Sequence, residues 1–190
     1  ASRAPPHGYG SPAYCKIVPS GTIPALVHDG FTLGESDAIA EYLNELAPEP
    51  AMLPEPIKER AMARALSRFH DTRIEPLLRS YFGQVAPANR NAAFIAENAV
   101  LLQHRFNQLA EIRTPSPLLT GADLSLADCG FVPSFAILNC LRGLLGFDLI
   151  LPASIKAYEA ALCAHPSVCD EYAAYAKVLA EWAAAKMAGS

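Results

Sequence analysis

The first 46 residues alternate apolar and polar positions differently from the rest of the chain. Residues 25–28 and 31–33 form two short, mostly apolar runs, separated by Asp29-Gly30, a dipeptide typical of tight β-hairpin turns. From residue 36 to about 46, apolar residues recur at intervals of three and four, as on one face of a helix. The pattern predicts a β-hairpin followed directly by a helix.

The remainder of the chain has a helical period throughout. A proline-rich segment at 47–56 separates it from the hairpin part, and Pro76 is expected to kink the first long helix. Residues 11–18, ahead of the hairpin, also look helical. The further helices are predicted at about 57–84, 89–113, 125–145, 153–164 and 166–187. We therefore expect a small α/β part and a larger all-helical part.

Composition describes a packed, alanine-rich helical protein. Of the 190 residues, 52% are hydrophobic and 18% are charged, which excludes a disordered chain. The net charge of -4 argues against a nucleic acid or an anionic membrane as partner. The longest uncharged helical stretch, 129–141, is too short to span a bilayer, so we interpret it as a buried central helix.

The five cysteines indicate reduced thiols. They stand at positions 15, 129, 140, 163 and 169, with no Cys-x-x-Cys pair and no Cys/His spacing of a metal site. Their odd number, with two in the apolar helix, favours a cytoplasmic location, and we expect no bound metal.

Two predicted helix starts contain polar residues that could bind a ligand or cap the helix. Glu35 and Ser36 stand where the hairpin gives way to a helix, and a helix N-terminus favours a carboxylate ligand. There Ser36 can donate hydrogen bonds to a carboxylate, while Glu35 can accept from an ammonium group. Farther on, Ser125 and Asp128 have capping-box spacing, which predicts a capped central helix. The residues expected to be buried on that helix are Phe131, Phe135 and Leu138.

Three segments together closely resemble the cytosolic glutathione transferase family, in its bacterial type. They are Thr22-Ile23-Pro24-Ala25-Leu26, Gly34-Glu35-Ser36-Asp37-Ala38-Ile39 and the stretch 119–128. The resemblance implies an α+β protein. Its thioredoxin-like α/β domain would occupy 1–47, a linker 48–56, and an all-α C-terminal domain 57–190.

The resemblance also implies a glutathione site. In the family the bond before the matching proline is cis, so Ile23–Pro24 should be cis, with the Ile23 backbone facing the cysteinyl part of glutathione. Glu35 and Ser36 would hold its γ-glutamyl end.

The long helix at 57–84 walls the electrophile pocket in relatives, which makes Arg73, Tyr81 and Phe82 the candidate pocket residues. His70 and Asp71 are adjacent on this helix, so we expect their side chains to diverge.

One departure from the family concerns the beginning of its first domain. That domain opens with a strand, a helix and a second strand, a unit of roughly 30 residues. Residues 1–10 contain four Gly and Pro residues and cannot supply it. We expect this unit upstream of Ala1, together with the Ser, Tyr or Cys that activates the thiol. Cys15 does not match the position of the catalytic cysteine found in some relatives.

The function implied is that of a cytoplasmic, homodimeric glutathione transferase in detoxification. Glutathione would be the co-substrate, and its thiolate would attack a small hydrophobic electrophile. Two alternatives remain open. One is a glutathione-dependent isomerase of the maleylacetoacetate or maleylpyruvate type, and the other is a related binding protein without turnover.

Overall fold

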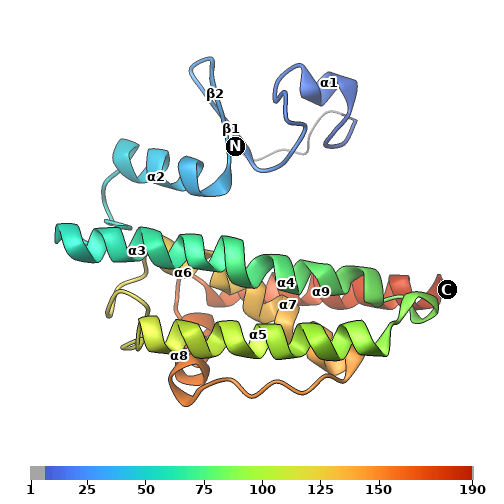
Figure 1. The fold of residues 1–190 in the computed structure, drawn as a ribbon. Helices are drawn as coiled ribbons and strands as arrows, with labels where there is room; N and C mark the ends of the chain where they lie inside the picture. The colour runs from blue at the N-terminus through green and yellow to red at the C-terminus, as the bar shows by residue number, and fades with distance from the viewer. Residues whose placement is uncertain (1–6, 190) are drawn as a thin grey trace. The chain divides into compact units, whose positions relative to one another are not determined.

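The computed structural model describes residues 7–189, and the chain divides into two compact units, Ala1–Met52 and Leu53–Ser190. The boundary falls within the stretch 48–56, which the sequence marks as a linker. The expectation that residues 1–10 contribute no strand–helix–strand unit lies in part outside the described residues. Each unit is built from its own local signals, and Figure 1 shows the elements of both.

The first unit contains the predicted hairpin and helix. Strands β1 (Ala25–His28) and β2 (Phe31–Gly34) pair antiparallel, and α2 spans Ser36–Leu46. Both turn residues, Asp29 and Gly30, have positive φ angles of 48° and 83°. Positive φ at both central positions is the type I′ geometry that matches the twist of a hairpin. The two strands form a two-stranded sheet within the described residues.

Ahead of the hairpin, helix α1 covers only Pro12–Cys15, although 11–18 was expected to be helical. After Cys15 the chain continues as a turn, in which the N–H groups of Ile17 and Val18 both donate to the Tyr14 carbonyl. The segment is fixed by Tyr14, a buried residue whose hydroxyl donates to the carbonyl of Thr22 at 2.8 Å. That bond holds the backbone directly ahead of Ile23.

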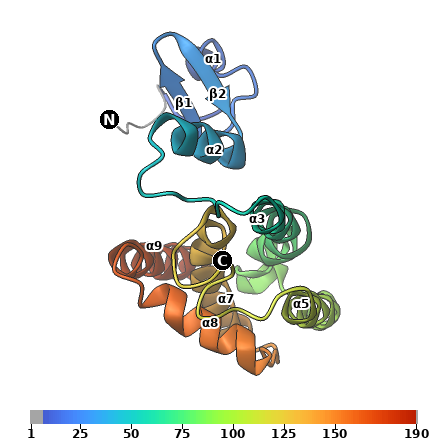
Figure 2. The ribbon, with the colours of Figure 1, turned by 90° about the vertical axis from the view of Figure 1, so that its left-hand side faces the viewer.

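The second unit is entirely helical. Figure 2 shows α7 (Phe131–Leu145) in the middle, with the other long helices around it. The second unit has a continuous core of buried apolar side chains, to which each of its long helices contributes. Around α7 lie the segments α3 (Ile57–Phe69), η1 (His70–Ile74), α4 (Glu75–Ser80), η2 (Tyr81–Gln84), η3 (Pro87–Asn89), α5 (Ala92–Ile112), α6 (Leu126–Cys129), α8 (Ala153–Cys163) and α9 (Cys169–Ala188).

The long helix predicted over 57–84 changes its winding near Pro76. Instead of a simple kink, the chain forms the π-helical turn η1 between α3 and α4. Pro76 has no N–H, and in an α-helix its ring would clash with the carbonyl of Thr72, four residues earlier. The wider π turn directly ahead of the proline takes up this mismatch, and such turns are frequent at functional sites.

The apolar stretch predicted as the central helix is interrupted once, at Gly130, between α6 and α7. Residues 126–145 are long and apolar enough to pass as a membrane span by length and composition. However, Phe131, Phe135 and Leu138 are all 0% exposed, as predicted, because they pack inside the helical unit. This burial fits a core helix.

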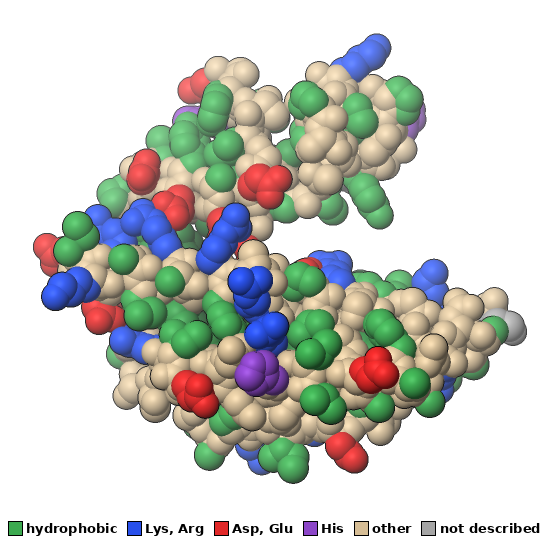
Figure 3. All heavy atoms as spheres, in the orientation of Figure 1, with side chains coloured by type: hydrophobic (Ala, Val, Ile, Leu, Met, Phe, Trp, Pro, Cys, Tyr) green, Lys and Arg blue, Asp and Glu red, His purple; other side chains and the backbone are tan. Residues whose placement is uncertain are grey.

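The outer side of α3 is strongly basic. In Figure 3, Lys and Arg side chains gather over this helix, which carries Lys58, Arg60, Arg64 and Arg68. Arg60 donates to the carbonyls of Pro54 and Glu55, and so fixes the chain where the helical unit begins.

The predicted cap of the central helix is confirmed. Asp128 is fully buried, and its carboxylate accepts hydrogen bonds from the Ser125 N–H at 3.0 Å and the Ser125 hydroxyl at 2.8 Å. It also accepts from the Leu119 N–H at 3.0 Å, which ties the preceding loop to the helix start. A buried carboxylate is tolerated only with such partners, and here it has three.

Replacing this carboxylate should therefore weaken the whole helical unit. We expect Asp128→Ala to lower the free energy of unfolding by about 2–4 kcal/mol, because it leaves buried donors without an acceptor. Asp123→Ala, at an exposed position in the same loop, is the matched control and should change it by less than about 0.5 kcal/mol. Urea unfolding followed by Trp182 fluorescence measures both. Equal stability of the two variants would contradict the capping role.

Candidate functional site

The Ile23–Pro24 segment lies at the entrance to β1. The Ile23–Pro24 peptide bond is cis, as the resemblance predicts. Ile23 is 58% exposed. An exposed residue next to a strand can pair with the backbone of a peptide-like ligand, as an added strand would.

Glu35 has an unusual backbone for a residue with a side chain. It is the N-cap residue of α2, with φ 66° and ψ 115°, and its own side chain makes no capping bond. Positive φ in a non-glycine residue costs free energy and persists where the surroundings impose it, which is most frequent at functional sites. The exposed carboxylate of Glu35 thus remains available to a cationic group.

Ser36 is the first residue of α2 and is exposed. The first intrahelical bond runs from the Ile39 N–H to the Glu35 carbonyl, at 2.9 Å. The N–H groups ahead of Ile39 have no acceptor in the helix, and the positive end of the helix dipole lies there. The hydroxyl of Ser36 and this helix end can therefore bind a carboxylate together.

Tyr42 fixes the position of α2 against the hairpin. Its hydroxyl lies 2.7 Å from Nδ1 of His28 on β1, and its ring contacts Phe31 on β2 at 5.7 Å between centroids. Because Tyr42 lies in the middle of α2, these contacts position the helix start, with Glu35 and Ser36, relative to the strand that follows Pro24.

The three candidate pocket residues differ in burial. Arg73, in η1, is exposed, and Phe82 is half-buried against Trp182, with 4.9 Å between ring centroids. Tyr81 is fully buried, and its hydroxyl donates to the Ile95 carbonyl at 3.2 Å. Burial raises the pKa of Tyr81 to about 12, which keeps the phenol neutral. Tyr81 is therefore a core residue of the helical unit and does not itself face a substrate, in contrast to the prediction.

The interpretation of His70 and Asp71 as diverging side chains is wrong. Nδ1 of His70 lies 2.8 Å from the Asp71 carboxylate, while Nε2 lies 2.7 Å from the Ser134 hydroxyl on α7. Both residues belong to the π-helical turn, whose wider winding invalidates spacing rules taken from an α-helix. Pro76 was the sequence signal for this contact, because a proline inside a helix disturbs the regular winding just ahead of it.

Ser134, His70 and Asp71 are hydrogen-bonded in the order of a nucleophilic triad. However, Ser134 and His70 are buried in the core of the helical unit. Ser134 is 2% exposed and His70 is 3% exposed, so a substrate could not reach the hydroxyl. We interpret the contact as a buried hydrogen bond that joins η1 to the central helix.

Two thiols of the helical unit, Cys140 and Cys163, are poor nucleophiles. Burial raises the pKa of Cys140, and burial together with the negative charge of Glu159 raises that of Cys163 to about 11. Both therefore stay protonated near neutral pH. Among residues 7–189, no group of three His, Cys, Asp or Glu side chains could hold a metal ion.

Comparison with known proteins finds similarity to one family. Residues 3–51 match the family described as "Glutathione S-transferase, N-terminal domain". A maleylacetoacetate isomerase of Rattus norvegicus is 36% identical over 121 residues, which are 62% of this chain and 54% of that protein. The chain thus spans about half the length of the curated relatives it matches.

Solved structures agree with this result. A delta-class glutathione transferase of Nilaparvata lugens superimposes with a TM-score of 0.78 at 21% identity, covering 94% of this chain and 82% of that one. A maleyl pyruvate isomerase, described as a bacterial glutathione S-transferase of the Zeta class, gives 0.66 at 26% identity, over 84% and 76%. Residues 3–51 thus match the first domain of glutathione S-transferases, and the chain has the fold of that family, a thioredoxin-like first domain and a helical second domain.

The backbone of Glu35 provides a direct test of local strain. Glu35→Gly should protect the amides of β2 and α2 from hydrogen exchange more than Glu35→Ala does, by about 0.5–1 kcal/mol. Glycine alone avoids the Cβ penalty at this φ, although its larger unfolded-state entropy offsets part of the gain. Both variants lack the carboxylate, so their difference isolates the backbone. Greater protection in the alanine variant would contradict the strained geometry.

The His70 contact gives a second test in the helical unit. A Cβ added at Gly130 would lie 2.5 Å from Nδ1 of His70, so Gly130→Ala should destabilise the unit by about 1–3 kcal/mol in urea unfolding. Gly143→Ala, in α7 with nothing within 4 Å of its added Cβ, is the control and should be neutral or stabilising by up to about 1 kcal/mol. A neutral Gly130→Ala would show that His70 is not packed against this glycine.

Proposed function

We propose that this protein is a glutathione transferase, which binds glutathione through Ile23, Pro24, Glu35 and Ser36. The observation that carries the proposal is the juxtaposition in one small unit of an exposed residue before a cis proline and a Glu-Ser pair at a helix start. The match of this same segment to the N-terminal domain of the family supports it.

Each group of the ligand has a complementary partner. The γ-glutamyl carboxylate would accept hydrogen bonds from Ser36 and from the N–H groups at the start of α2, and its ammonium group would pair with Glu35. The backbone of Ile23 would pair with the cysteinyl residue, which directs the thiol away from the helix. The thiolate is the reactive species, so an activating donor is also required.

The electrophile would be a small hydrophobic molecule. Nucleophilic attack by the glutathione sulfur forms a carbon–sulfur bond and expels a leaving group with its electron pair. We propose Arg73 and Phe82 as residues near the apolar substrate. A cytoplasmic homodimer acting in detoxification is the setting we propose, in keeping with five cysteines that form no disulfides.

Isomerisation is the second candidate, favoured by the similarity to maleylacetoacetate and maleyl pyruvate isomerases. In such a reaction the thiolate adds to a cis double bond, rotation follows about the resulting single bond, and elimination returns the thiolate. Glutathione is then not consumed, which separates this activity from transfer.

Ser36→Ala tests the binding site. Calorimetric titration of the full-length protein with glutathione should show affinity weakened by about 1–3 kcal/mol in this variant, because a charged ligand group loses a hydrogen bond. Thr32→Ala, at an exposed position on the neighbouring strand β2, serves as the control and should bind as the unchanged protein does. Absence of any glutathione binding by the unchanged protein would remove the proposal.

Turnover distinguishes the candidates. With 1-chloro-2,4-dinitrobenzene as electrophile, a transferase consumes one glutathione for each product formed. With maleylacetone, an isomerase converts substrate while the glutathione concentration stays constant. Binding without either reaction would favour the binding protein over both enzymes.

A further inference from the structure

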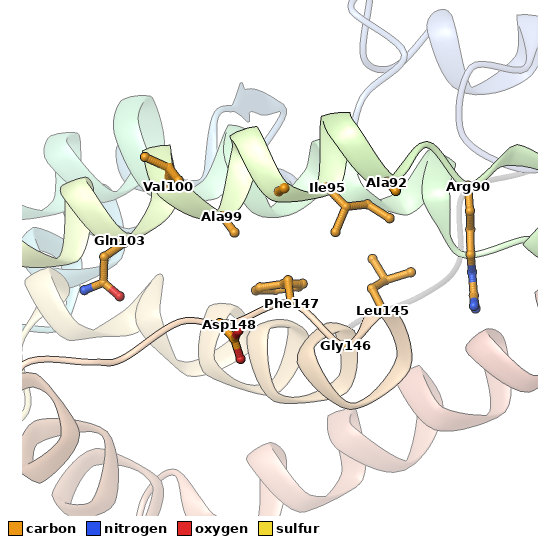
Figure 4. A pocket seen from close by; sticks show the side chains of 11 residues that line it. Arg90, Ala92, Ile95, Ala99, Val100, Gln103, Leu145, Gly146, Phe147 and Asp148 are labelled. Atoms are coloured by element: carbon orange, nitrogen blue, oxygen red, sulfur yellow. The ribbon is translucent and has the colours of Figure 1, made fainter.

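A groove in the helical unit borders the outer face of α5. It has a volume of about 690 Å³ and lies between this helix and the turn that follows α7. Figure 4 shows Ala92 and Ala99 on one wall, facing Leu145 and Phe147 on the other. All the residues that line the groove belong to the helical unit, and none is among the proposed glutathione-binding residues.

The α5 wall combines small side chains with one that projects. Ala92, Ala96 and Ala99 recur at intervals of four and three and so share the helix face that lines the groove. Val100 stands at the edge of this face and is 70% exposed. Small residues let a second helix approach closely, and a projecting side chain packs into such a gap on a neighbour. The same stretch of α5 therefore offers both a gap and a side chain that fits one.

The opposite wall is held in place by three separate contacts. Gly146 ends α7 with φ 66°, a left-handed conformation that reverses the chain. The ring of Phe147 stacks on Tyr81 with 4.7 Å between centroids and 1° between planes. The Gln103 amide donates to the Ile150 carbonyl at 2.8 Å and accepts from the Ile150 N–H at 2.7 Å. The groove is therefore formed in the single chain, before any partner binds.

The two ends of the groove carry opposite charges. Arg90 lies at one end, and its guanidinium makes one contact of 3.3 Å, with the Val85 carbonyl, which leaves further N–H donors. Asp148 is exposed on the turn and lies toward the Gln103 end. Within the part of the chain that the structure describes, neither Arg90 nor Asp148 is in an ion pair. A partner that presents an anion at the first end and a cation toward the other would pair both charges.

A second copy of the chain is such a partner. Two identical faces fit each other about a two-fold axis when each group meets its counterpart on the other copy. With α5 antiparallel to α5 and the axis at Ala96, a residue four positions ahead faces one four positions behind, so Val100 meets Ala92 of the second copy. The same rotation brings the Arg90 end of one groove to the opposite end of the other, toward which Asp148 lies.

Charge repulsion does not oppose this arrangement at its centre. Glu97 follows Ala96 in sequence, but it is about 100° further round the helix and does not line the groove. The lining side chains of α5 on either side of Ala96 are Ile95 and Ala99, both apolar. Apolar groups therefore meet at the axis, and the charges meet at the ends.

We propose that this face is a contact between two copies of the chain, which pack antiparallel through α5 about a two-fold axis at Ala96. Each Val100 lies over the gap at Ala92 of the other copy, and each Arg90 pairs with Asp148 of the other copy. Exposed apolar side chains are thereby removed from water. The helical unit provides the whole contact, so the contact forms with or without glutathione.

Sedimentation of the whole chain over a range of concentrations measures the contact. Ala96→Arg places two charged side chains against each other at the axis and should remove the association step that the unchanged protein shows. Ala184→Arg makes the same change at an exposed alanine of α9, outside the groove, and should leave that step in place. Equal melting temperatures of the two variants show that neither has lost its fold.

Reversing the charges identifies a second copy as the partner. Arg90→Asp and Asp148→Arg should each weaken association by about tenfold, because each puts like charges together at both ends of the contact. An equimolar mixture of these two variants should associate as the unchanged protein does, since each carries the charges that the other lacks. Arg105→Asp, which changes a cation of α5 outside the groove, is the control and should leave association unchanged.

Three results would overturn the proposal. If Ala96→Arg and Ala184→Arg sediment alike, the groove is not a contact between copies. If the mixture of charge variants associates no better than either variant alone, Arg90 and Asp148 do not pair between copies. If the unchanged protein stays monomeric at every concentration, the face has another occupant. Saturating S-hexylglutathione should alter none of these outcomes, which keeps this test separate from that of the glutathione site.

Discussion

The buried carboxylate of Asp128 is the interaction on which the helical unit depends. It joins the loop at Leu119 to the start of α6 at Ser125. Tyr158 of α8 lies beside it, and burial, followed by the negative charge of Asp128, raises the pKa of this phenol well above its usual value. Without those contacts the central helix would have no defined starting point.

From that starting point the position of α7 determines most of the core. Phe131 packs against His70 and Tyr158, with 4.7 Å and 5.6 Å between ring centroids, so it links η1 to α8. Ser134, one turn later, holds His70 by its hydroxyl. The C-terminal end of α7 then places Phe147 against Tyr81. Phe147 forms one wall of a groove whose other wall is α5. A single helix thus connects the cap, the π-helical turn and the groove.

The sequence predicts the structure correctly wherever the deciding contacts join residues that are close along the chain. Asp29-Gly30 specifies a turn with two positive φ angles, and Ser125 with Asp128 specifies a helix start, because in each case residues within four positions make the deciding contacts. Glu35 and Ser36 were found by resemblance, and the structure adds the strained backbone of Glu35. The pairing of His70 with Asp71 was missed because it depends on the altered winding ahead of Pro76. The groove could not be predicted either, since it arises from the distance between α5 and a turn more than forty residues later.

The two units differ in how much side-chain surface they bury, and this difference bears on binding. Of the residues described in the first unit, Tyr14, Val18 and Gly21 are buried, whereas the second has a continuous core. In the part of the first unit that the structure describes, few buried side chains hold the hairpin and α2 together. A ligand that binds only the folded form adds stability as its concentration exceeds the dissociation constant, about 2.7 kcal/mol at a hundredfold excess. Glutathione bound at Ile23, Glu35 and Ser36 would connect the strand entrance to the start of α2. Tyr42 joins the middle of the same helix to His28 and Phe31, beside the hairpin turn. We therefore expect glutathione binding to stabilise the folded form of this unit.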